Sequence, residues 1–308
     1  MKIFHLLKGL VSTIRLPNLA IICLSLYLVR YTIVKSILEY TGYSSSVTDD
    51  AYIFLVCATL FIAAAGYVIN DYFDKEIDAV NKPGKNYTAT LLSSGSTIAL
   101  YIFLNVAGFI LIWYFGELVN KRYVLLVFIF SAGLLYFYSS SYKKMFLVGN
   151  IIISFLAALT IALSVLFDSQ ALLSQPVKLL VISYALFAFL MTLIREIIKD
   201  CEDMYGDEAF GSATLPVIAG IKNARIISSC LTAIVLSLII YIQVIQLQWL
   251  NIISFAYTII FIEVPLLLLI VRSFTATKKS DDTWNSRLSK IIMVTGILSM
   301  LVFQLTSE

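Results

Sequence analysis

Two aspartate-rich stretches of the sequence have the residue types and the spacing of a divalent-cation site. The first reads Asn70-Asp71-Tyr72-Phe73-Asp74-Lys75-Glu76-Ile77-Asp78, and the second reads Asp200-Cys201-Glu202-Asp203-Met204-Tyr205-Gly206-Asp207. In each stretch the three aspartates stand at positions i, i+3 and i+7. These positions share one face of a helix, so each stretch predicts a column of carboxylates.

A column of like charges is destabilising unless something positive lies beside it. A hard divalent cation with oxygen ligands meets that need, and Mg²⁺ is typically bound by one or two carboxylates together with phosphate oxygens of a substrate. Ordinary solvated acids at two helix ends are the alternative, but the identical spacing of the two stretches favours the metal. The candidate Mg²⁺ ligands are Asn70, Asp71, Asp74, Asp78, Asp200, Asp203 and Asp207.

Paired acid columns of this kind suit a diphosphate ester that the metal bridges. Neutralising the leaving diphosphate assists its departure without a protein nucleophile. The single histidine of the chain, His5, agrees with this interpretation, because it makes histidine-based metal sites and Ser/His/Asp catalysis uneconomical. Arg195 and Lys199 stand one helical turn apart just before the second stretch, where they offer hydrogen-bond donors to a phosphate or simply anchor a helix at the membrane surface.

The elements that position these acids are predicted to be transmembrane helices. Of the 308 residues, 60% are hydrophobic and only 13% are charged, which indicates an all-α polytopic membrane protein. Nine apolar stretches are long enough to span a bilayer. We place them near residues 17–37, 51–69, 97–115, 123–140, 147–167, 179–198, 226–246, 250–271 and 288–305.

The distribution of Lys and Arg predicts the orientation. With the N-terminus in the cytoplasm, only five of the 22 Lys and Arg residues would lie outside, namely Arg30, Lys35, Lys121, Arg122 and Lys178. Both acidic stretches would then face the cytoplasm. Residues 1–16 are expected to form an amphipathic lead-in on the membrane surface, and residues 1–308 a single integral domain. The basic residues form no long run of the kind that binds nucleic acid, so we expect no nucleic-acid partner.

The two acidic stretches, each following the second or the sixth predicted span, resemble the motifs of the UbiA superfamily of intramembrane prenyltransferases. Three further segments extend the resemblance: Tyr138-Ser139-Ser140-Ser141-Tyr142-Lys143-Lys144 with Gly149-Asn150, Asn81-Lys82-Pro83, and Thr214-Leu215-Pro216. It implies nine helices around a central cavity, Mg²⁺ as cofactor and a prenyl diphosphate as substrate. With the residues considered above, the predicted catalytic residues are Asp74, Asp203, Lys143 and Lys199. The predicted substrate-binding residues are Tyr138, Lys143, Lys144, Asn150, Arg195, Lys199 and Lys82.

Within this superfamily the run from Arg195 to Asp207 looks most like the geranylgeranylglycerol-phosphate geranylgeranyltransferase branch. That resemblance implies geranylgeranyl diphosphate as donor and a prenylated glycerol phosphate as acceptor. An aromatic acceptor, as in quinone or haem biosynthesis, remains open, because the loop after Pro83 departs from the pattern of many relatives. A membrane transporter is the alternative from another class, although transporter sites usually lie near the bilayer midplane rather than at one face.

Glu263 is an ionisable residue within a predicted span, two positions before Pro265. An intramembrane carboxyl is a candidate functional residue. The other interpretation is a protonated side chain that is hydrogen-bonded to a neighbouring helix near the backbone carbonyl freed by the proline.

Overall fold

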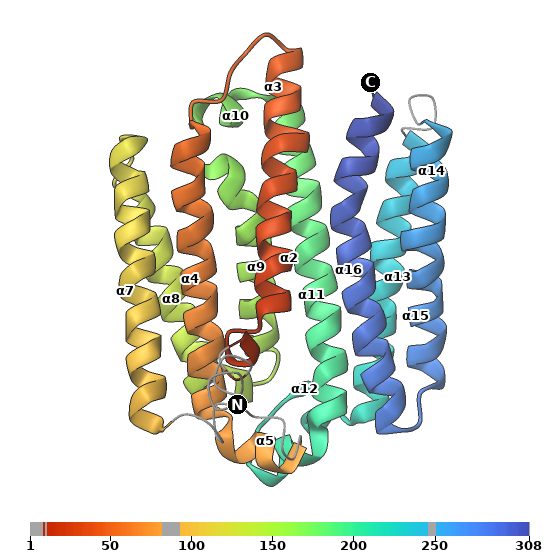
Figure 1. Ribbon diagram of the computed structural model, residues 1–308. Coiled ribbons are helices and arrows are strands. Elements are labelled where there is room, and N and C mark those ends of the chain that lie inside the picture. Colours follow the sequence, from red (N-terminus) through yellow and green to blue (C-terminus); the bar gives the residue numbers. More distant parts are fainter. Residues whose placement is uncertain (1–8, 10, 82–92, 246–250, 308) are drawn as a thin grey trace.

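Long helices running alternately up and down form the molecule in the computed structural model, with the N- and C-termini at opposite ends (Figure 1). The structure describes residues 9, 11–81, 93–245 and 251–307. Every regular element within these residues is helical, so the predicted all-α class is confirmed. An odd number of spans, as predicted, places the termini on opposite sides.

Each of the nine predicted spans corresponds to a helical segment. In the described part of the chain, eight segments are long and apolar enough to cross a membrane, and the ninth, α8, is a shorter apolar helix. The nine are α2 with η1 and α3 (Leu16–Leu28, Val29–Lys35, Ser36–Tyr40), α4 (Asp49–Phe73), α7 (Ser94–Leu118), α8 (Val124–Ser140), α9 (Val148–Leu166), α11 (Gln175–Ala209), α13 (Ile221–Ile245), α14 with η3 and α15 (Ile252–Thr258, Ile259–Glu263, Val264–Thr275), and α16 (Lys279–Ser307).

Short elements join the long helices at both ends of the bundle. One end carries α5 (Lys75–Asn81), the 3₁₀ turn η2 (Tyr142–Lys144) and α12 (Leu215–Ala219), and the other end carries α10 (Ser169–Leu173) (Figure 1). The first group is the one that bears the acidic stretches. The predicted lead-in lies largely outside the described residues, and of it the structure shows helical residues 11–13 followed by a turn at Ile14 and Arg15.

The helices are held together by packing and by hydrogen bonds between helices. Lipid tails are as apolar as leucine, so burial of apolar surface gives helix association little driving force in a bilayer. Polar contacts therefore matter: Tyr184 Oη lies 2.9 Å from Ser299 Oγ between α11 and α16, and Tyr52 Oη lies 2.8 Å from Ser164 Oγ between α4 and α9. Helix α11 is central, because it packs against α9, α13 and α16.

A buried ion-pair cluster fixes the end of the bundle away from the acidic stretches. Arg30, on the π-helical turn η1, is 1% exposed and contacts the carboxylates of Asp49 and Asp168, each at 3.3 Å. Asp168 also accepts hydrogen bonds from Ser45 and Ser46 and from the backbone N–H groups that begin α10. The cluster ties the start of α10 to η1 and to the loop before α4.

Glu263 lies at the end of the second π-helical turn, η3. Its Oε1 is buried and has no hydrogen-bond partner among the described residues, so the expected bond to a neighbouring helix is absent for that atom. The backbone carbonyl that Pro265 leaves without its helical donor is that of Phe261, and it instead accepts a 2.8 Å hydrogen bond from Thr295 Oγ1 of α16.

Candidate active site

The first acidic stretch contains a bend of the chain at Asp74. Helix α4 ends at Phe73, Asp74 has non-helical angles (φ −86°, ψ 0°), and α5 begins at Lys75. The prediction of one continuous helical face from Asp71 to Asp78 is therefore wrong in detail. The carboxylate of Asp74 is held at the bend by Asn70 Nδ2, at 2.7 Å, and by the ammonium of Lys143. Aspartate competes with the backbone for hydrogen bonds and is a poor residue for a helix interior, which suits it to this position.

The second acidic stretch lies on one unbroken helix, as predicted. Helix α11 continues to Ala209, well beyond the predicted span end at residue 198, so Asp200, Asp203 and Asp207 share its last turns. The hydropathy pattern ends where the charged residues begin, but the helix does not. Residues in the following loop stabilise this end: Thr214 Oγ1 donates to Asp207 Oδ2 at 3.4 Å, and Ser212 N donates to the Asp207 carbonyl at 2.8 Å.

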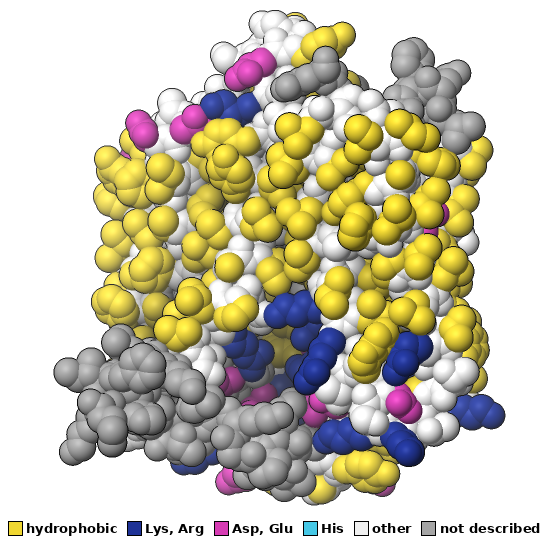
Figure 2. All heavy atoms as spheres, turned by 45° about the vertical axis from the view of Figure 1, so that its right-hand side comes forward, with side chains coloured by type: hydrophobic (Ala, Val, Ile, Leu, Met, Phe, Trp, Pro, Cys, Tyr) yellow, Lys and Arg dark blue, Asp and Glu magenta, His cyan; other side chains and the backbone are white. Residues whose placement is uncertain are grey.

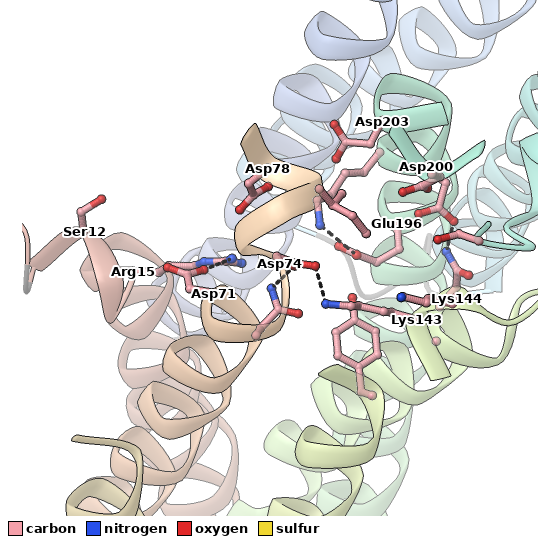
Figure 3. A pocket seen from close by; sticks show the side chains of 18 residues that line it. Ser12, Arg15, Asp71, Asp74, Asp78, Lys143, Lys144, Glu196, Asp200 and Asp203 are labelled. Carbon is pink, nitrogen blue, oxygen red and sulfur yellow. Dashed lines mark hydrogen bonds and ion pairs between the residues drawn. The ribbon is translucent and has the colours of Figure 1, made fainter. Parts of the chain in front are cut away.

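A polar cavity of about 340 Å³ brings the two stretches together (Figure 3). All seven predicted metal ligands line it, together with five of the predicted catalytic and substrate-binding residues, namely Tyr138, Lys143, Lys144, Asn150 and Lys199. The volume lies within the range of small-molecule sites. The sequence-predicted residues are thus assembled at one end of the bundle, from α4, α5, α8, η2, α9 and α11.

Lys143 and Asn150 each contact an acid of the cavity. The Lys143 ammonium pairs with Asp74, and Asn150 Nδ2 donates a 2.7 Å hydrogen bond to Asp200 Oδ2. Burial lowers the pKa of Lys143, and the neighbouring Asp74 carboxylate offsets this only in part. The turn that carries Lys143 is tied to the second acidic stretch, because Ala213 N donates to the Lys144 carbonyl at 2.7 Å.

Two charged residues of the cavity wall were not among the predicted site residues. Arg15 Nη2 pairs with Asp71 Oδ1 at 2.9 Å, and burial, which opposes the charge, is outweighed by this carboxylate, so the pKa of Arg15 is raised above its ordinary value. Glu196 is 7% exposed and lies between Arg195 and Lys199, at 2.6 and 3.7 Å. The signal for Glu196 was its position one turn before Asp200, which extends the acid column backwards.

Two predicted substrate-binding residues are not seen in the cavity wall. Arg195 is adjacent, but its guanidinium is bonded to Glu196 and it does not line the cavity. Lys82 lies outside the described residues.

The donor set fits Mg²⁺ bound jointly by protein and substrate. The amide oxygen of Asn70 is buried against the cavity without a hydrogen-bond partner among the described residues, and it is an oxygen of the type that hard cations bind. Yet no three carboxylates of the described chain converge on a single point as a ready-made metal site. An amide oxygen beside carboxylates is an all-oxygen donor set, which a hard cation such as Mg²⁺ accepts together with phosphate oxygens of a substrate.

The sequence matches the UbiA prenyltransferase family over residues 28–293. The chain belongs to this family. It is 35% identical over 260 residues to digeranylgeranylglyceryl phosphate synthase of Methanothermobacter thermautotrophicus, covering 82% of this chain and 84% of that one. It is 34% identical over 239 residues to the synthase of the same name from Methanobrevibacter smithii, covering 75% and 81%. The predicted likeness to this branch of the UbiA family is thereby confirmed.

Solved structures of the UbiA family share the fold. A structure of digeranylgeranylglyceryl phosphate synthase superposes with a TM-score of 0.65 at 25% identity, covering 97% of this chain and 98% of that one. A UbiA homologue from Archaeoglobus fulgidus bound to GPP and Mg²⁺ has a TM-score of 0.57 at 15% identity, covering 95% and 99%. The polytopic helical architecture predicted from the sequence is therefore that of the UbiA family.

Proposed function

We propose that this prenyltransferase carries out the reaction named in its relatives, the Mg²⁺-dependent transfer of a geranylgeranyl group from its diphosphate to a prenylated glycerol phosphate. The observation that carries the proposal is that one cavity is lined by both acid columns and by Lys143 and Lys199. The relatives named digeranylgeranylglyceryl phosphate synthase support the acceptor, and the Archaeoglobus fulgidus homologue bound to GPP and Mg²⁺ supports the donor and the metal.

The chain's own residues would hold the donor by its charged end. Asn70, Asp74, Asp203 and Asp207 are the leading Mg²⁺ ligands, with Asp71, Asp78 and Asp200 completing or supporting the set, and bound Mg²⁺ would neutralise the diphosphate as it leaves. Lys143, Lys144 and Lys199 donate charge-assisted hydrogen bonds to the phosphate oxygens, and Tyr138 and Asn150 border the same space.

Transfer proceeds by ionisation of the donor. The allylic C–O bond breaks and diphosphate leaves with the electron pair, which produces an allylic cation. The acceptor hydroxyl oxygen then forms the new ether bond and gives its proton to the released diphosphate, the most negative group in the cavity. The cationic side chains act at the place where negative charge develops, which is how a preorganised site lowers such a barrier.

We place the cavity on the cytoplasmic face, because that orientation puts most Lys and Arg residues inside. The bundle would lie in the bilayer with the apolar belt seen in Figure 2 in contact with lipid. The donor diphosphate would then enter from the cytoplasm while its prenyl chain remains among the helices.

Two measurements test the proposal. Purified protein is incubated with radiolabelled geranylgeranyl diphosphate, Mg²⁺ and a panel of acceptors, and the product is expected with geranylgeranylglyceryl phosphate. Transfer only to an aromatic acceptor would replace the proposal with quinone or haem prenylation. Uptake of a solute by proteoliposomes without any transfer would favour a transporter.

The second measurement removes one acid at a time. Asp74→Ala and Asp203→Ala are each expected to abolish Mg²⁺-dependent transfer while the variants still unfold cooperatively in detergent. Asp50→Ala is the matched control, because Asp50 is exposed in the first turn of α4, at the far end of the helix from the cavity. Full activity in either cavity variant would refute the assignment of the metal ligands.

A further inference from the structure

A second cationic cluster lies beside the cavity, where α2, α11 and α16 approach one another. Lys290 Nζ of α16 donates a 2.7 Å hydrogen bond to Asn18 Oδ1 of α2. Arg15 directly precedes α2 and Arg195 lies on α11, and both of these helices pack against α16. We call these four residues, Arg15, Asn18, Arg195 and Lys290, the basic cluster. Figure 2 shows Lys and Arg side chains around a hollow near the lower end of the molecule, below the apolar belt.

The basic cluster holds more positive charge than its neighbouring carboxylates neutralise. Arg15 is paired with Asp71 and Arg195 with Glu196. Lys290 has no carboxylate within ion-pair distance among the described residues, and its hydrogen bond goes to a neutral amide. Like charges brought together at a half-buried site are unfavourable, so the arrangement suits an anion that arrives from outside the protein.

The location of the basic cluster relative to the cavity decides which anion fits. Arg15 and Glu196 line the cavity, whereas Arg195 and Lys290 do not. Arg15, which pairs with Asp71, joins the cluster to the first acid column, whereas Arg195 and Lys290 lie outside the cavity lining. An acceptor whose hydroxyl enters the cavity would leave a nearby phosphate at the cluster. A cation–π contact also holds Arg15 in place, because its guanidinium lies 5.0 Å from the centre of the Tyr67 ring.

We propose that the basic cluster binds the phosphate monoester of the acceptor lipid, with Lys290 and Arg195 as its main ligands, and thereby selects a glycerol phosphate over an uncharged or aromatic acceptor. This inference rests on the proposed function. It assigns Arg195 to the acceptor rather than to the donor diphosphate. A phosphate monoester carries about two negative charges at neutral pH and accepts several charge-assisted hydrogen bonds, which matches two cations from facing helices.

The test compares steady-state kinetics of the wild type and the Lys290→Gln variant, with geranylgeranyl diphosphate and geranylgeranylglyceryl phosphate as substrates. The KM for the acceptor is expected to rise roughly tenfold to a hundredfold, the loss associated with a hydrogen bond to a charged group. The KM for the donor is expected to change less than about twofold, because the acid columns remain. Arg195→Gln should raise the acceptor KM in the same way.

The lipid phosphate itself supplies the second arm of the test. Geranylgeranylglycerol without phosphate should be a poor acceptor for the wild type. Lys290→Gln should raise the KM for this acceptor little further, since the phosphate that Lys290 is proposed to bind is missing. Lys290→Arg should preserve a low acceptor KM. Lys222→Gln is the matched control, because Lys222 is an exposed cation on α13 without an ion pair among the described residues.

The outcomes separate the inference from the proposed function. If the wild type does not transfer a geranylgeranyl group to geranylgeranylglyceryl phosphate, the proposed function is refuted before any variant is made. If the wild type is active but Lys290→Gln leaves the acceptor KM unchanged, or raises the donor KM instead, the inference is overturned and the proposed function stands. Thermal unfolding of each variant in detergent shows whether a kinetic change arises from loss of fold, and Lys290→Arg provides the kinetic comparison if Lys290→Gln unfolds.

Discussion

Gly149 is the position at which one added methyl group should disturb the site most. A Cβ atom at residue 149 would lie 2.7 Å from Lys143 Cα, 3.1 Å from the Tyr142 carbonyl oxygen and 3.2 Å from Lys143 N. All three atoms belong to the backbone of η2, so no side-chain rotation can relieve the contact. Ordinary van der Waals contact begins near 3.4 Å, and the turn must therefore retreat by about 0.7 Å in Gly149→Ala.

That retreat moves Lys143 away from Asp74 and from the place proposed for the diphosphate. A misplacement of about 1 Å at a reacting centre can cost about a hundredfold in rate. We therefore expect Gly149→Ala to lower kcat by roughly tenfold to a hundredfold, with an overpacking cost of about 1–3 kcal/mol in stability. Radiolabelled transfer at saturating substrates measures the first quantity, and thermal unfolding in detergent measures the second.

Gly133 provides the matched control within the same part of the chain. It lies in α8, and a Cβ there would meet nothing within 4 Å. Gly133→Ala is thus expected to retain activity and to stabilise the helix slightly. If Gly149→Ala keeps its kcat within about twofold of the wild type while remaining folded, the role of the close approach in positioning Lys143 is refuted.

Two further predictions concern stability. Arg225 Nε and Nη2 bind both oxygens of the buried Asp282 at 2.9 and 2.6 Å. Arg225→Ala should therefore lower the free energy of unfolding by about 3–5 kcal/mol, because it leaves a buried charge unpaired. The double variant with Asp282→Ala should recover part of the lost thermal stability, and additive losses would contradict this. Burial opposes ionisation of Asp168, but hydrogen bonds from Ser45, Ala171 N and Ser46 outweigh it and lower the pKa of Asp168 below 3.8. The ionised carboxylate should therefore stabilise the fold fully above about pH 4, and this stabilisation should be lost as the pH falls further. Asp168→Asn should lower the unfolding temperature at pH 7 and flatten its fall in acid, and an unchanged acid profile would rule out this cluster as the cause.

The sequence predicted the spans well because a bilayer imposes one strong requirement, a run of about 20 apolar residues. It predicted the end of α11 poorly for the same reason. The apolar segment ends at the charged residues that begin near residue 195. Glu, Lys, Met and Arg are nevertheless good helix formers, and the helix continues to Ala209. The Asp74 carboxylate at the bend pairs with Lys143, which is 69 positions away, and no local pattern indicates this contact.

The cationic residues of the site were harder to predict than the acids. A carboxylate column at a span end is unusual, so its pattern is informative. Lysine and arginine at cytoplasmic span ends are common, and the same residue type serves as membrane anchor, ion-pair partner or substrate ligand. Lys290 and Asn18 are far apart in sequence and are joined by a hydrogen bond because α16 packs against α2, so the surroundings of Lys290 are visible in the tertiary structure alone.

The pairing of cations with acids at the cavity also explains how two carboxylate columns are tolerated there. Lys143 neutralises Asp74, Arg15 neutralises Asp71, and Lys199 lies 3.7 Å from Glu196. Each cation is therefore already adjacent to a carboxylate proposed to bind Mg²⁺, or one turn from it. When phosphate oxygens and the metal occupy the same space, an ammonium need move only from a carboxylate oxygen to a neighbouring phosphate oxygen. The interactions that stabilise the fold are thus placed to stabilise the departing diphosphate, at little cost in reorganisation.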